Sequence, residues 1–188
     1  LAPNLSATKL RHLLDQVDPD RSRDLRFGTV DTWITWHLNE GASHVTDFSN
    51  AAVTGLRSGD GLRWDPKLLA ALNIPEAVLP TVVDSAGVIA PATALAGAPP
   101  IAGIAGDQQA SLLGQGCTRP GDAKITFGTG GMLDMCLDER PAFATQGTGG
   151  TFPIVTRGSG GGRRKRRAQF PHDRQDPGVR HLAPAPTG

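Results

Sequence analysis

The chain has 188 residues, with nineteen Lys and Arg, eighteen Asp and Glu, and two cysteines, Cys117 and Cys136. Two cysteines are too few for a disulfide framework or a cysteine zinc site, so we expect two unpaired thiols and a reducing, cytoplasmic location. No run approaches the roughly 20 apolar residues that a membrane span requires, and a membrane partner is not expected.

A first helix is predicted from Ser6, which is placed to cap the first turn. Apolar side chains then recur at the spacing of one helical face, at Leu10, Leu13, Leu14 and Val17. This spacing predicts a helix that packs with these four side chains against the rest of the fold.

A second helix is predicted to open at Thr29 or Asp31. It contains Trp33 and Trp36, both of which we expect in the core. Gly41 lies where a C-terminal cap needs a positive φ. The helix is therefore predicted to end just before this glycine.

Asp65-Pro66 predicts a third helix, with Asp65 as the N-cap and Pro66 at the first helical position. Further along, residues 101–105 form a short apolar run that stops at Gly106-Asp107. Helical spacing resumes at residue 110, so this segment is predicted as a strand, a sharp turn and a helix.

Residues 122–127 and 132–137 are predicted as two strands joined by a tight turn at Gly128-Thr129-Gly130-Gly131, and residues 151–155 could supply a third strand. The composition then changes. Residues 157–188 hold eight Lys and Arg against two Asp and Glu, including a run of five cations at 163–167. Such a segment buries too little apolar surface to offset an ordering cost of about 1–2 kcal/mol per residue, so we expect 158–188 to be a disordered basic tail.

Asp107 is the first candidate for chemistry. It follows a predicted strand and opens a helix, where open α/β sheets bind ligands and where backbone N–H groups converge. A carboxylate there can accept a proton from a bound hydroxyl, Gln108 can orient a polyol, and Gly106 lets a substrate approach the backbone. The alternative is that Asp107 only caps the helix.

The turn at 128–131 is the second candidate. Its glycines allow several backbone N–H groups to face one point, and the Thr129 hydroxyl adds another donor, which suits phosphate oxygens. The alternative is a plain hairpin turn. Together the two turns could supply a base for an acceptor hydroxyl and donors for a transferred phosphoryl group.

Four spaced motifs occur in order along the chain: Phe27-Gly28-Thr29-Val30-Asp31-Thr32-Trp33, His44-Val45-Thr46-Asp47-Phe48-Ser49-Asn50-Ala51, Gly103-Ile104-Ala105-Gly106-Asp107-Gln108-Gln109-Ala110 and Phe127-Gly128-Thr129-Gly130. With these motifs, residues 3–150 resemble the FGGY carbohydrate kinase family, and glycerol kinases within it. The resemblance implies an α/β, ribonuclease H-like and actin-like fold, with ATP and substrate meeting in a cleft between two domains. Its motifs at 29–33 and 47–50 look architectural.

By this resemblance Asp107 would be the general base and a neighbour of Mg²⁺, and Gln108 would contact the polyol. The nucleotide phosphates would contact Gly128, Thr129 and Gly130. Asn4 stands where the family has the tyrosine that lines the glycerol pocket, so Asn4 is expected in the substrate site with an altered pocket shape.

The fold class expected is therefore α/β and incomplete: residues 1–116 end the first domain, 120–157 open the second, and 158–188 form the tail. The expected activity is ATP- and Mg²⁺-dependent phosphorylation of a terminal hydroxyl of glycerol or a related polyol or sugar. The family's N-terminal phosphate loop and C-terminal adenosine motif are not found in this chain, and the change in composition near 158 resembles a reading-frame shift.

Two other readings stay open at this stage. One is an inactive, truncated or frameshifted kinase remnant, and the weaker one is a nucleic-acid-associated protein led by the basic tail. No aromatic platform accompanies the tail, so nucleic acid is not the expected partner. Whether the chain forms a homo-oligomer is left open.

Overall fold

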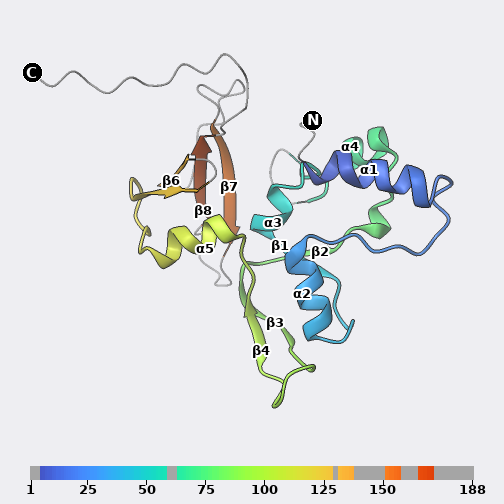
Figure 1. The fold of residues 1–188 in the computed structure, drawn as a ribbon, viewed down its shortest axis with the longest axis horizontal. Helices are drawn as coiled ribbons and strands as arrows, with labels where there is room; N and C mark the ends of the chain where they lie inside the picture. Colours follow the sequence, from blue (N-terminus) through green and yellow to red (C-terminus); the bar gives the residue numbers. More distant parts are fainter. Residues whose placement is uncertain (1–4, 59–62, 129–130, 138–150, 158–164, 172–188) are drawn as a thin grey trace, which may run out of the picture.

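The computed structural model describes residues 5–58, 63–128, 131–137, 151–157 and 165–171 (Figure 1). Helices and a short parallel sheet occupy one end of this part of the chain, and a larger antiparallel sheet lies at the other. None of the helices in the described ranges has the length and apolarity that a bilayer crossing requires.

The helical end is built around α1 (Ser6–Val17), α3 (Phe48–Ala52) and α4 (Pro66–Leu72), with β1 (Val45–Asp47) parallel to β2 (Thr81–Val83). Burial of apolar side chains from these elements and their loops drives this packing. The core contains Ala7, Leu10, Leu14, Ala51, Leu56, Trp64, Leu69, Leu72, Ile74, Val78 and Leu79.

Helix α1 forms as predicted, but its details differ. Leu5 is the N-cap and Ser6 is the first helical residue, so the prediction that Ser6 caps the helix is wrong. The buried face is Ala7, Leu10 and Leu14, whereas the other two members of the predicted stripe, Leu13 and Val17, are exposed. The buried face of α1 is narrower than the predicted stripe because this helix lies at the surface of the helical end.

Helix α2 (Val30–Leu38) begins after Thr29, as predicted, and Gly41 has φ 84° and donates its N–H to the Trp36 carbonyl. Its buried residues are Thr32 and Thr35, however. Trp36 is half-buried and Trp33 is 64% exposed, so the expectation of a tryptophan core is wrong.

Helix α4 confirms its predicted start. The Asp65 carboxylate accepts the backbone N–H groups of Lys67 and Leu68, and Pro66 is in the first turn. A 3₁₀ turn, η1 (Glu76–Val78), follows it and leads into β2.

Strands β3 (Ala86–Pro91) and β4 (Pro100–Gly103) form an antiparallel hairpin that projects away from both ends of the molecule (Figure 1). The predicted strand at 101–105 corresponds to β4, which starts and ends slightly earlier. A sharp turn then leads into α5 (Asp107–Gly114), which lies beside the larger sheet.

The larger sheet has the order β5-β6-β8-β7, from β5 (Ala123–Phe127), β6 (Gly131–Leu137), β7 (Thr151–Arg157) and β8 (Lys165–Pro171). The three strands predicted in this region are confirmed. β8 falls within the segment expected to be disordered, and that expectation is wrong for its seven residues. The backbone groups of β8 pair with both β6 and β7, and this pairing stabilises a strand whose sequence is mostly polar. The rest of 158–188 lies outside the described residues.

Candidate active site around the Asp107 turn

Asp107 is the first residue of α5 and is exposed. Gly106, not Asp107, is the N-cap, and one Asp107 carboxylate oxygen accepts the N–H of Gln108 at 2.9 Å. The structure thus places the carboxylate on the surface where the helix begins, where the positive end of the helix dipole stabilises negative charge.

A buried hydrogen-bond network fixes the backbone just before Asp107. The Gly106 N–H donates to Ser49 Oγ at 2.7 Å, and Ser49 Oγ donates to the Asp47 carboxylate at 2.7 Å. Ser85 Oγ donates to the same carboxylate at 2.6 Å. Asp47 and Ser49 are fully buried, and Asp47 also caps α3 through the backbone N–H groups of Ser49 and Asn50. The motif at 47–50 therefore anchors the turn that presents Asp107.

The Gln109 side chain lies against Gly106 inside this turn. A Cβ at this position would lie 2.6 Å from Gln109 Oε1 and 3.5 Å from Ser49 Oγ. The first distance is shorter than van der Waals contact allows. The space beside the Gly106 backbone is therefore occupied by the buried Gln109 side chain, which differs from the expectation that a substrate approaches there.

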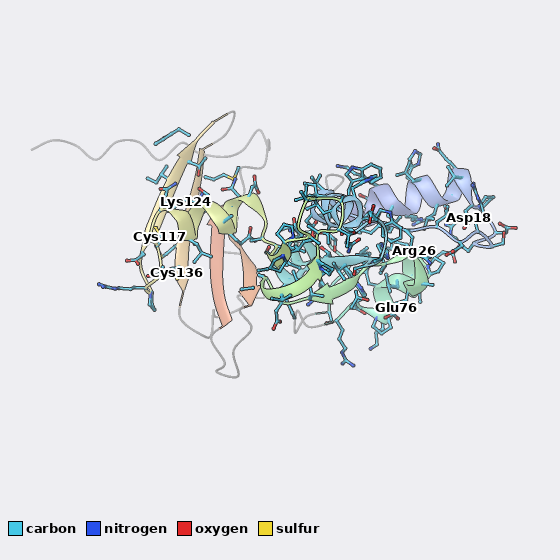
Figure 2. All side chains as sticks on the ribbon, turned by 90° about the horizontal axis from the view of Figure 1, so that it is seen from below. Asp18, Arg26, Glu76, Cys117, Lys124 and Cys136 are labelled. Carbon is cyan, nitrogen blue, oxygen red and sulfur yellow. The ribbon has the colours of Figure 1, made fainter. Side chains whose placement is uncertain are left out.

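A second anchor holds the residue after Asp107. Lys124 Nζ donates to Gln108 Oε1 and to Thr126 Oγ1, each at 2.9 Å. It also forms an ion pair with Asp134, at 2.7 Å, in which both side chains are almost fully buried. Lys124 and Asp134 are direct cross-strand partners on β5 and β6. Figure 2 shows Lys124 in the part of the molecule that holds this sheet, together with the buried free cysteines Cys117 and Cys136.

The electrostatics of this anchor are those of a desolvated carboxylate. Burial raises the pKa of Asp134, and the negative charge of Asp107 acts in the same direction. The ion pair with Lys124 opposes the rise in this pKa. Within the described residues, Lys124 is the ion-pair partner of Asp134, so loss of the lysine would leave a buried charge uncompensated.

Of the predicted site residues, the structure describes Asp107, Gln108 and Gly128, and Asn4, Thr129 and Gly130 lie outside the described residues. The hydrogen bond from Lys124 to Gln108 joins the helix that begins at Asp107 to the strand that leads into Gly128. The two predicted halves of the site are therefore physically linked through β5.

Sequence reasoning missed Lys124, Asp134 and Ser49 as parts of this arrangement. The signal for Lys124 was present, because it alternates with the apolar side chains of Ala123 and Ile125 along a strand. Ser49 gave no separable signal, since a serine beside an N-cap is common in any helix start.

Comparison with known proteins identifies the family of the chain. Residues 1–114 match the N-terminal domain of the FGGY family of carbohydrate kinases. The match covers more than half of the chain, and the chain belongs to this family.

Among relatives of known name are glycerol kinases. The chain is 54% identical over 151 residues to the glycerol kinase of Alkalilimnicola ehrlichii, covering 75% of this chain and 30% of the relative. It is 45% identical over 166 residues to glycerol kinase 2 of Pseudomonas aeruginosa, covering 85% of this chain and 33% of the relative. The chain thus spans about a third of the length of the curated relatives it matches.

Solved structures show the same partial correspondence. The ADP complex of Plasmodium falciparum glycerol kinase superposes with a TM-score of 0.75 at 26% identity, covering 88% of this chain and 34% of that one. A xylulose kinase from Rhodospirillum rubrum, at 23% identity and a TM-score of 0.70, shares the fold. The chain is an α/β fragment that corresponds to about a third of these kinases.

Proposed function

We propose that this chain forms part of the active site of a cytoplasmic kinase that transfers a phosphoryl group from ATP to a terminal hydroxyl of glycerol or a related polyol. The observation that carries the proposal is the Asp107 carboxylate, which is exposed at the start of α5 and held between two anchored neighbours. The similarity to proteins named glycerol kinases supports the acceptor class.

In this proposal Asp107 accepts the proton of the acceptor hydroxyl as that oxygen attacks the terminal phosphorus of ATP. A carboxylate suits this task because the developing alkoxide requires a base within hydrogen-bond reach. Gln108, one residue further on, contacts the polyol. Burial of Ser49 and Asp47 keeps the turn from shifting, which serves positioning, the main protein contribution to phosphoryl transfer.

Phosphate contacts are assigned to the glycine turn that follows β5. Gly128, Thr129 and Gly130 would offer backbone N–H groups and one hydroxyl to phosphate oxygens. Asn4 would line the polyol pocket. The assignment of 1–116 to the end of one domain and 120–157 to the start of the next, in an actin-like fold, belongs to the same proposal.

The residues present fit a magnesium ion that accompanies the nucleotide. In kinase sites Mg²⁺ is bound through one or two carboxylates together with phosphate oxygens and water. Asp107 is an exposed carboxylate that has no ion-pair partner in the described ranges, so it is available as such a ligand. When bound, the ion neutralises charge on the phosphates.

The test is ADP release by the 188-residue chain with glycerol and a panel of polyols and sugars. Asp107→Asn should lower turnover by about 100-fold or more, the usual contribution of a general base. The matched control is Asp24→Asn, because Asp24 is an exposed aspartate far from the turn in sequence. Equal turnover in D107N and the unaltered chain would refute the role of Asp107. No turnover with any acceptor would favour the inactive kinase remnant.

A further inference from the structure

The side-chain amide of Gln108 has a defined orientation in the structure. Its Oε1 accepts a hydrogen bond from Lys124 Nζ at 2.9 Å. An ammonium group has three donors and no acceptor, so only the oxygen of the amide can face it. The Nε2 group of Gln108 therefore points away from Lys124.

We propose that Lys124, held by Asp134, is a positioning residue that orients Gln108 so that its amide N–H groups face the acceptor substrate. This inference rests on the proposed function for the identity of the substrate, a polyol, but its structural half concerns this chain alone. Gln108 follows Asp107 directly, so a fixed amide lies beside the proposed base.

The lysine is suited to this role because its own position is fixed from several sides. Asp134 approaches Nζ to 2.7 Å from the neighbouring strand, and Thr126 accepts a second hydrogen bond at 2.9 Å from the same strand. Both charged side chains are almost fully excluded from solvent. In such surroundings the ion pair is poorly screened, so Lys124 cannot readily leave its partners.

The amide orientation has a consequence for recognition. Donor groups directed at the substrate favour a hydroxyl oxygen that accepts while its proton is passed to Asp107. A freely rotating glutamine would also offer its oxygen, which would compete with Asp107 for the hydroxyl proton. The orientation therefore complements the proposed base.

The rival explanation is that the Lys124–Asp134 pair only joins β5 to β6. Both explanations predict a loss of stability when one charge is removed, so stability does not separate them. The two explanations differ for the Gln108 amide. If the pair only joins β5 to β6, removing both of its charges should leave the order and orientation of this amide unchanged.

The experiment uses NMR of the side-chain NH₂ groups in the full chain, with Gln108→Met to assign the Gln108 signal. The first variant is Lys124→Met. Because it leaves Asp134 buried and uncompensated and can fail to fold, the second variant is the double substitution Lys124→Met with Asp134→Asn, which removes both charges at similar volume. The control is Lys67→Met, which removes an exposed lysine on α4.

In the unaltered chain and in K67M, the Gln108 NH₂ group should be as ordered as rigid backbone, with an order parameter near 0.85, and in the folded double variant it should fall below about 0.6. Titration with glycerol should then show affinity weakened by about tenfold or more in the double variant, as expected for one lost hydrogen bond.

An unchanged order parameter in the folded double variant would overturn the inference whatever the activity of the chain. An ordered amide that is lost in the double variant supports the positioning role of Lys124. If neither glycerol nor any polyol or sugar of the panel binds the unaltered chain in that case, the proposed function is refuted, whereas the structural half of the inference, that Lys124 fixes the Gln108 amide, still holds.

Discussion

Ser49 shows at the scale of one residue how the candidate site is held. Its hydroxyl accepts from the Gly106 N–H and donates to Asp47, so one oxygen links residues that are far apart in the sequence. Because Ser49 is buried, water cannot replace either bond without entering the core. The Asp107 turn therefore depends on a buried side chain from a distant part of the sequence.

We expect Ser49→Ala to lower the free energy of unfolding by about 1–3 kcal/mol, because the substitution leaves the part-buried Gly106 N–H and the buried Asp47 carboxylate without this partner. Urea unfolding followed by circular dichroism measures the change. The matched control is Ser22→Ala, since Ser22 is exposed and its hydroxyl donates to the nearby Asp20 carboxylate. If both variants lost equally little free energy of unfolding, the claim that the buried network stabilises the fold would be contradicted.

At the residue scale, sequence reasoning singled out Asp107 and Gln108 as candidate site residues but did not identify the side chains that hold them. The supports depend on the strand register. A four-residue turn at 128–131 leads to a pairing in which Lys124 faces Met135. The structure pairs Phe127 with Gly131, which brings Lys124 opposite Asp134. A shift of one residue changes which side chains meet, and single-sequence patterns do not fix it.

Helix starts show what local sequence can and cannot specify at the scale of an element. Both α1 and α4 were predicted from a polar residue placed before an apolar stripe. Asp65 is a true N-cap because its carboxylate accepts two backbone N–H groups of α4. Ser6 is already inside α1, where Leu5 takes the cap position.

This contrast gives a paired prediction. Asp65→Ala should lower the free energy of unfolding by about 1 kcal/mol, within the usual range of 0.5–2 for a lost N-cap. Ser6→Ala should change it by less than about 0.5 kcal/mol, as surface substitutions away from caps do. Urea midpoints of the two variants and the unaltered chain provide the comparison. An equal loss in both would contradict the cap assignment.

The elements with clear local apolar spacing and turn residues were predictable, whereas the short elements β1, α3, β2 and β3 had no prediction from the sequence. Burial was less predictable. Trp33 is exposed and Thr35 buried on the same helix, because the body lies against the face that carries the threonines. The neighbours of a short helix decide which of its faces is buried. Helix α2 has apolar residues on more than one face, so its sequence alone does not decide between them.

At the scale of the whole molecule, the hairpin of β5 and β6 has an unusual distribution of polarity. Its side towards α5 contains the buried Lys124 and Asp134. The opposite face is apolar and exposed, with Phe127 at 87%, Ile125 at 59% and Leu133 at 39%. Ile125 and Leu133 are cross-strand partners, so this surface is continuous.

We expect the exposed apolar face to cause self-association of the chain, because contiguous apolar surface tends to be buried against another surface. The double substitution of Ile125 and Phe127 by threonine should reduce the binding of a dye that reports exposed apolar surface, and association should then need a higher protein concentration. Threonine is chosen because it keeps a high strand propensity. Sedimentation velocity over a concentration series measures the shift. The control is Val88→Thr on β3, where Val88 is also strongly exposed. Association unchanged in the double variant but lost in V88T would place the contact elsewhere.

The two anchors beside Asp107 belong to different parts of the molecule. Gly106 is tied to α3 at the helical end, whereas Gln108 is tied to β5 in the larger sheet. Asp107 therefore occupies the pivot between them, and a rotation of one part against the other cannot preserve both hydrogen bonds unless the peptide at 106–108 twists. The carboxylate would turn with that peptide. The direction of the Asp107 carboxylate therefore depends on how the two ends of the fold are aligned.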